Sequence, residues 1–110
     1  MFIKDIRQKK ANTPVTGIYL VRKKELKKTK EDKPYLMLTL SDKSGSIEAR
    51  MWDDAISANT LFQTGDVVQV GGIVSEFREE TQLKVDSFAK LEQGQFSYED
   101  IIRVVENPEQ

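Results

Sequence analysis

The chain contains neither cysteine nor histidine among its 110 residues. Their absence excludes disulfide bonds, thiolate nucleophiles, imidazole acid–base catalysis and most zinc sites from this chain. No apolar run is long enough to cross a bilayer as a helix, and the start of the sequence shows no signal peptide. A chain without cysteine suits a reducing compartment, so we expect a cytoplasmic protein.

The sequence also lacks the motifs of catalysis and of cofactor binding. It has no phosphate-binding glycine loop, no nucleophile elbow and no spacing typical of metal ligands, so we expect no cofactor and no metal. Adjacent acids do occur, for example at Asp53-Asp54 and Glu79-Glu80. Neighbouring residues of a strand point to opposite faces, and Asp53-Asp54 is better explained as a helix cap. We therefore expect no catalysis by this chain alone.

The length fits a single domain that buries a core of its own. The net charge of −1 conceals an asymmetry, because residues 1–33 carry eleven Lys and Arg against four Asp and Glu, whereas residues 34–110 carry six against fourteen. A locally basic segment attracts a polyanion over about a Debye length. Lysine-rich loops also simply keep a protein soluble, and composition leaves both interpretations open.

The most informative segment predicts a hairpin. From Tyr35 to Leu40, leucines alternate with other residues, which is the period of a strand with one apolar face. The turn Asp42-Lys43-Ser44-Gly45 follows, with Asp where turns favour it and Gly where a positive φ is needed. A second alternation from Ser46 to Trp52 predicts the returning strand. The second face of this hairpin then presents Tyr35, Met37, Arg50 and Trp52.

Turn residues and apolar spacing divide the rest of the chain. Before the hairpin we predict a lead that forms an apolar plug, and then a long strand at residues 15–26 with a bulge or bend at Gly17. After the hairpin we predict a helix at residues 55–62, two strands at residues 67–74 and 81–91, and a short helix from Tyr98 to about Val105. The two glycines at residues 71–72 allow tight curvature or close backbone approach.

Five strands with a helix between the third and the fourth is the order of the oligonucleotide/oligosaccharide-binding (OB) fold. The predicted class is therefore all-β, a five-stranded Greek-key OB-fold barrel with a helix between strands 3 and 4 and a short C-terminal helix. The corresponding domain division is an N-terminal lead at residues 1–12, the OB-fold domain at residues 13–92, and a C-terminal helix or linker at residues 93–110.

The segment KPYLMLTLSDKSGSIEARMWD, residues 33–53, resembles OB domains of the tRNA-anticodon-binding class. More closely, it resembles the N-terminal OB domain of bacterial 3′-5′ exoribonucleases in which an HD phosphohydrolase domain follows. Shorter stretches of resemblance extend this over about residues 2–91. The resemblance implies binding of single-stranded nucleic acid, RNA more than DNA, on behalf of a nuclease domain on the same polypeptide or on a partner.

Two features depart from that family. The metal-binding His-Asp pair of the HD domain cannot exist in a chain without histidine, so this chain does not perform the hydrolysis. The turn Arg78-Glu79-Glu80 carries two acids where comparable domains usually place glycine and basic or neutral residues, which weakens the case for strong polyanion binding. One hypothesis is that the chain is the front domain of a longer nuclease, with residues 96–110 as the start of a linker.

In an OB barrel the ligand usually lies across strands 2 and 3, between the loops that follow strands 1 and 4. A base stacked on an aromatic side chain there gains about 1–3 kcal/mol. Cations pair with phosphates, and the affinity that they supply falls with salt. The candidate nucleic-acid-binding residues are therefore Lys30, Lys33, Tyr35, Met37, Arg50, Trp52, Phe77 and Arg78.

The candidates also have plainer structural explanations. Trp52 directly precedes the helix and suits a core plug beneath it, and Phe77 suits the end of the barrel. Arg50 beside Glu48 suits a surface pair worth under about 1 kcal/mol. Tyr19 lies on a strand whose inward parity the sequence leaves open.

The sequence thus predicts an OB-fold module that binds single-stranded RNA or DNA by stacking and electrostatic attraction, without strong sequence preference. An HD phosphohydrolase domain, in cis or in trans, is the expected protein partner, and no membrane partner is expected. The alternative is a protein-interaction or oligomerisation domain. The acidic second half, the Glu79-Glu80 turn and the apolar stripe of the last helix fit that alternative.

Overall fold

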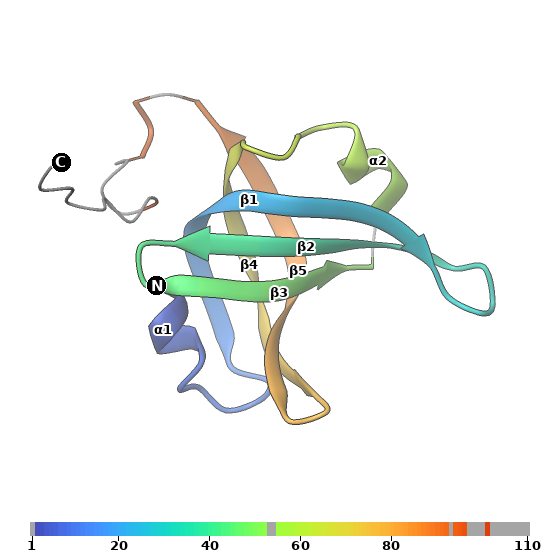
Figure 1. Ribbon diagram of the computed structural model, residues 1–110, viewed down its shortest axis with the longest axis horizontal. Helices are drawn as coiled ribbons and strands as arrows, with labels where there is room; N and C mark the ends of the chain where they lie inside the picture. Colours follow the sequence, from blue (N-terminus) through green and yellow to red (C-terminus); the bar gives the residue numbers. More distant parts are fainter. Residues whose placement is uncertain (1, 53–54, 93, 97–100, 102–110) are drawn as a thin grey trace, which may run out of the picture.

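The structure is a computed structural model that describes residues 2–52, 55–92, 94–96 and 101, except for the side chain of Phe77. Five strands form a closed barrel in the order β1-β2-β3-β5-β4 (Figure 1). All pairs are antiparallel apart from β3 with β5, which is parallel. This confirms the predicted OB-type barrel. The elements are α1 (Ile3–Ile6), β1 (Pro14–Lys28), β2 (Pro34–Asp42), β3 (Gly45–Met51), α2 (Ala55–Asn59), β4 (Val67–Phe77) and β5 (Glu80–Leu91).

Strand β1 serves both sides of the barrel. Its first half pairs with β4, and its second half pairs with β2 as far as Lys28 opposite Pro34. The β1–β2 hairpin therefore projects beyond the barrel wall (Figure 1). The register shifts at Arg22, whereas the pairing of Gly17 with Val70 is regular. Of the bulge or bend predicted at Gly17, the bulge is therefore wrong. The irregularity falls where the strand leaves one partner for the other.

The hairpin alternation is as predicted. Every second residue of β2 and β3 is buried in the core, namely Leu36, Leu38, Leu40, Ile47, Ala49 and Met51. Tyr19 on β1 also points inward and is only 1% exposed, which answers the parity question that the sequence left open. Burial raises the pKa of its phenol, and the nearby carboxylate of Asp42 raises it further.

One of the two central glycines of β4, Gly72, permits a close backbone approach to β5, as predicted. The β4–β5 register shifts between Gly71 and Gly72. A Cβ added to Gly72 would lie 2.1 Å from the backbone oxygen of Lys84, so no larger residue fits there without movement of β5. The close approach bends the sheet at this point and helps to close the barrel.

The N-terminal lead is fastened to the β2–β3 turn. Ile3 and Ile6 are fully buried in the core, so α1 is the predicted apolar plug. The backbone N–H of Ile3 donates to Asp42 Oδ2 at 2.9 Å, and that of Lys4 donates to Ser44 Oγ at 3.0 Å. These side chains satisfy two of the N–H groups that a helix start leaves without partners.

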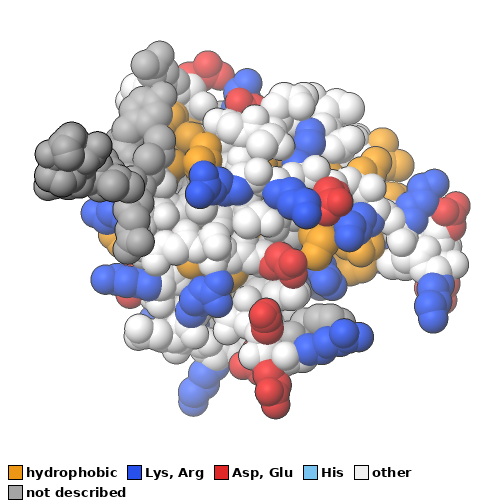
Figure 2. Space-filling model, viewed as in Figure 1, with side chains coloured by type: hydrophobic (Ala, Val, Ile, Leu, Met, Phe, Trp, Pro, Cys, Tyr) orange, Lys and Arg blue, Asp and Glu red, His pale blue; other side chains and the backbone are white. Residues whose placement is uncertain are grey.

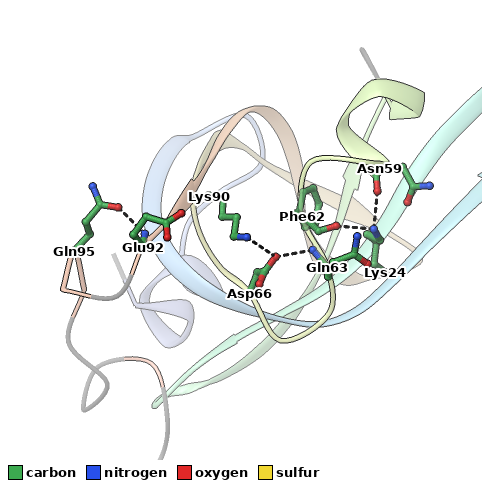
Figure 3. A network of polar contacts seen from close by, with 8 residues as sticks. All are labelled: Lys24, Asn59, Phe62, Gln63, Asp66, Lys90, Glu92 and Gln95. Atoms are coloured by element: carbon green, nitrogen blue, oxygen red, sulfur yellow. Dashed lines mark hydrogen bonds and ion pairs between the residues drawn. The ribbon is translucent and has the colours of Figure 1, made fainter.

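Helix α2 covers one end of the barrel and is shorter than the predicted helix at residues 55–62 (Figure 1). Lys24 of β1 donates from Nζ to the backbone oxygens of Asn59 and Phe62, both at 2.7 Å, and lies 5.2 Å from the Phe62 ring centroid. Figure 3 shows this contact beside Asp66, which accepts from the backbone N–H of Gln63 and faces the ammonium of Lys90. A cation at the helix C-terminus stabilises the exposed carbonyl groups.

Parts of the sequence prediction lie outside the described residues. These are the helix cap at Asp53-Asp54 and, apart from Ile101, the helix predicted at residues 98–105. Within the described part of the chain, no helix has both the length and the apolar composition to span a bilayer.

Candidate nucleic-acid interface

The outer side of β1, β2, β3 and β5 forms one continuous surface, which we call the outer face. Pairing across the strands arranges its side chains in rows. Met37 on β2 pairs with Glu25 on one side and with Arg50 on the other, and Arg50 pairs in turn with Lys84. The neighbouring row consists of Lys23, Thr39, Glu48 and Gln82.

Two aromatic rings lie together on this face, where β2 begins and β3 ends. Tyr35 and Trp52 are half-buried and stack with their ring centroids 4.5 Å apart at an interplanar angle of 28°. The guanidinium carbon of Arg50 lies 5.9 Å from the Tyr35 centroid, and Lys33 Nζ lies 5.6 Å from the Trp52 centroid. Figure 2 shows hydrophobic side chains reaching the surface between Lys and Arg side chains on this side of the molecule. Rings flanked by cations are the components of a stacking platform for bases.

The structure brings together five of the eight residues singled out from the sequence, namely Lys33, Tyr35, Met37, Arg50 and Trp52. Trp52 lies against Tyr35 and is not part of the buried core, which argues against the core-plug interpretation. Lys30 is exposed at the tip of the β1–β2 hairpin, and Arg78 is exposed in the β4–β5 turn. The side chain of Phe77 lies outside the described residues.

Sequence reasoning missed several cations of the outer face. Lys84 pairs with Arg50 across the β3–β5 ladder, and Lys27 pairs with Tyr35 across the β1–β2 ladder. The exposed position of Lys84 between buried Leu83 and Val85 is a readable alternation. That Lys84 lies beside Arg50 of β3 cannot be predicted from the sequence, because a parallel register joins segments that are distant in the chain.

Two of the carboxylates on the outer face, those of Glu25 and Glu48, have polar neighbours. Glu25 lies 3.5 Å from Lys23 Nζ and 3.9 Å from Lys27 Nζ. These pairs are exposed, so they contribute little to stability but reduce the local negative charge. Glu48 Oε1 accepts a hydrogen bond of 3.0 Å from Gln82 Nε2.

A hollow of about 190 Å³ adjoins the aromatic pair on the β5 side. We call it the β3–β5 hollow. Its walls contain two cations, an acid, a hydroxyl and an amide, together with a leucine and the tryptophan. The residues are Arg50, Trp52, Ser75, Glu76, Gln82, Leu83 and Lys84. Within the described residues, no three His, Cys, Asp or Glu side chains are placed to hold a metal ion.

The turn between β4 and β5 is tight and backbone-strained. Phe77 pairs with Glu80, which leaves Arg78 and Glu79 as a two-residue loop with φ values of 53° and 66°. Such a turn favours Asn and Gly, because other residues adopt positive φ at a cost. Both side chains are exposed, and the turn places one positive and one negative charge beyond one end of the outer face.

A family model described as the OB-fold nucleic acid binding domain matches residues 20–91, which include all five strands from the middle of β1 onward. The chain belongs to this family. The OB-fold domain is 42% identical over 55 residues to the 3′-5′ exoribonuclease YhaM of Halalkalibacterium halodurans, a match that covers 50% of the chain and 17% of that protein. It is 35% identical over 77 residues to YhaM of Bacillus subtilis, covering 69% of the chain and 24% of that protein.

Solved structures show the same fold. A replication protein A heterotrimer bound to single-stranded DNA matches with a TM-score of 0.59 and 20% identity, over 74% of this chain and 59% of the other. The OB-fold domain spans a quarter or less of the length of the two curated relatives. The match therefore concerns a binding module, and it does not extend to a catalytic domain.

Proposed function

We propose that the chain binds single-stranded nucleic acid, RNA in preference to DNA, across its outer face. The observation that carries the proposal is the stacked Tyr35–Trp52 pair with Arg50 and Lys33 beside it. Membership of a nucleic-acid-binding family supports the ligand class. The exoribonuclease relatives favour RNA, and the replication protein A complex favours an unpaired strand.

The arrangement supports binding by stacking and by charge. One base stacked on the aromatic pair contributes about 1–3 kcal/mol. Four cations adjoin the aromatic pair or the β3–β5 hollow and would meet phosphates, namely Lys27, Lys33, Arg50 and Lys84. If each neutralises one phosphate, the logarithm of the affinity falls with the logarithm of salt at a slope of about −2.8, that is, 0.7 for each single-strand contact.

The module serves a nuclease domain under this proposal. The relatives that it matches are much longer exoribonucleases, so a hydrolytic HD domain in the same polypeptide or in a partner would receive the strand. Residues 1–12, 13–92 and 93–110 would then act as lead, barrel and linker. Such a role belongs in the cytoplasm, where a chain without cysteine is also expected.

A titration with RNA at several salt concentrations tests the stacking contribution and the electrostatic contribution together. Trp52 is the single tryptophan of the chain, so its emission reports on the site. We expect single-stranded RNA to change this emission and to bind more tightly than single-stranded DNA or duplex, with a steep loss of affinity as salt rises. Replacing Tyr35 with Ala should weaken RNA binding about tenfold, within the range for the loss of one stacking contact. Salt-independent binding, or none at low salt, would exclude the proposal.

A second function, subunit assembly, is favoured by a different surface. Ile56 and Leu61, in and just beyond α2, are 59% and 60% exposed. Exposed large apolar side chains close together in sequence suit a protein contact. Sedimentation that shows a dimer, together with no effect of RNA on Trp52 emission at low salt, would favour this function.

A further inference from the structure

We propose that the β3–β5 hollow holds one nucleobase that carries an exocyclic amino group, so that cytosine is preferred to uracil. This inference rests on the proposed function, because it concerns the same strand on the same face. The nucleotide concerned is the one next to the base stacked on the aromatic pair. Trp52 belongs both to that pair and to the hollow, and Arg50, which also lines the hollow, has its guanidinium carbon 5.9 Å from the Tyr35 centroid, so the two positions are contiguous.

The hollow suits a base better than a phosphate. Its walls include the carboxylate of Glu76, which repels a phosphate but accepts hydrogen bonds from an amino group. Trp52 and Leu83 form an apolar part of the wall, which suits the ring of a base. Arg50 and Lys84 also line the hollow and are placed to meet the phosphates on either side of the inserted base.

Gln82 determines which base fits. This side chain is only 8% exposed, and its amide nitrogen donates to Glu48 Oε1 at 3.0 Å. A carboxylate only accepts hydrogen bonds, so the amide must turn its nitrogen towards Glu48 and its oxygen away. None of the described residues donates a hydrogen bond to that oxygen, and Gln82 is one of the residues that line the hollow. Under this proposal the oxygen faces the hollow as an acceptor whose orientation Glu48 fixes.

A fixed acceptor distinguishes the two pyrimidines. Cytosine has an amino group where uracil has a carbonyl oxygen. The amino group can donate to Gln82 Oε1, whereas the uracil oxygen would face it as a second acceptor and leave the Gln82 oxygen without a donor. An unsatisfied buried polar group costs enough to produce a preference of about tenfold.

Glu48 acts as a positioning residue in this scheme. Without its carboxylate the amide of Gln82 could rotate and donate to uracil instead. The isosteric change Glu48→Gln provides this freedom, because a glutamine both donates and accepts. Glu25→Gln is the matched control, since it removes the same charge from the same face but does not touch Gln82.

The experiment compares RNA oligonucleotides of cytidine and of uridine, about twelve nucleotides long, which falls within OB-fold site sizes. For the unaltered chain we expect about tenfold tighter binding of oligocytidine, and loss of that preference when the amino group is replaced by dimethylamino. The control Glu25→Gln should keep the preference while tightening binding of both probes. Glu48→Gln and Gln82→Leu should reduce the preference to about twofold or less.

The possible failures are distinguishable. Equal binding of the two oligonucleotides by the unaltered chain would overturn the base preference and leave the proposed function intact. Binding of neither at low salt would overturn the proposed function itself. A preference that survives Glu48→Gln, with thermal unfolding unchanged, would overturn the orienting role of Glu48.

Discussion

The role of Lys84 offers the sharpest test of the outer face, because this residue was not visible as a candidate in the sequence. It is exposed on β5 and pairs with Arg50 on β3. Replacing Lys84 with Gln removes one of the four cations assigned to phosphates. We expect the salt slope for single-stranded RNA to change from about −2.8 to about −2.1. At 0.1 M salt the loss of that contribution corresponds to about 1 kcal/mol, or about fivefold in affinity.

Lys90 provides a control on the same strand. It is exposed like Lys84, but its ammonium lies 3.6 Å from Asp66 Oδ2, away from the aromatic pair. Replacing Lys90 with Gln should leave the salt slope unchanged. Both changes are at the surface, so thermal unfolding should shift by no more than about 0.5 kcal/mol of stability in either case. Equal slopes for the two variants in titrations followed by Trp52 emission would refute the assignment of Lys84 to a phosphate.

Three further changes test the fold by thermal or denaturant unfolding. Asp42→Ala should cost about 1–3 kcal/mol of stability. It removes the carboxylate that accepts hydrogen bonds from the backbone N–H of Ile3, at 2.9 Å, and from that of Ser44, at 2.8 Å. An unchanged unfolding midpoint would contradict this. Gly72→Ala should destabilise by more than about 3 kcal/mol, since the new Cβ would meet the Lys84 backbone oxygen, and a native-like stability would show that β5 moves freely. Glu79→Gly should stabilise by about 1 kcal/mol by relieving a positive φ, whereas Glu79→Gln, which removes only the charge, should not.

The local part of the fold was predictable from sequence. The alternation on either side of the turn at residues 42–45 fixes which side chains are buried, because the period of a strand is two and one register slip would exchange the faces. Leu36 and Ile47 are accordingly buried, and Tyr35 and Trp52 are together on the outer side. These features depend on residues that are neighbours in the chain or are joined by a two-residue turn.

The features that sequence reasoning missed depend on distant pairing. Lys84 lies beside Arg50 only because β3 and β5 run parallel, which no local pattern encodes. The bulge falls at Arg22 because β1 changes partner there, and not at the glycine that the sequence offered. Helix α2 ends at Asn59, whose carbonyl oxygen accepts a hydrogen bond from Lys24 of β1. The helix predicted from the sequence ends three residues later, at Phe62. Each case is decided by a contact with another strand.

If the module presents RNA to a nuclease domain, as we propose, the charge pattern of the outer face suits a strand that passes over it rather than one that remains bound. Its cations are accompanied by Glu25 and Glu48, and Glu76 lines the β3–β5 hollow. These acids reduce the electrostatic contribution that is common to every position of a nucleic-acid strand. Stacking of about 1–3 kcal/mol for each base is regained at each step of one nucleotide. A module that presents RNA to a nuclease needs such moderate, repeated contacts, because a strand held by many unopposed cations would dissociate and advance slowly.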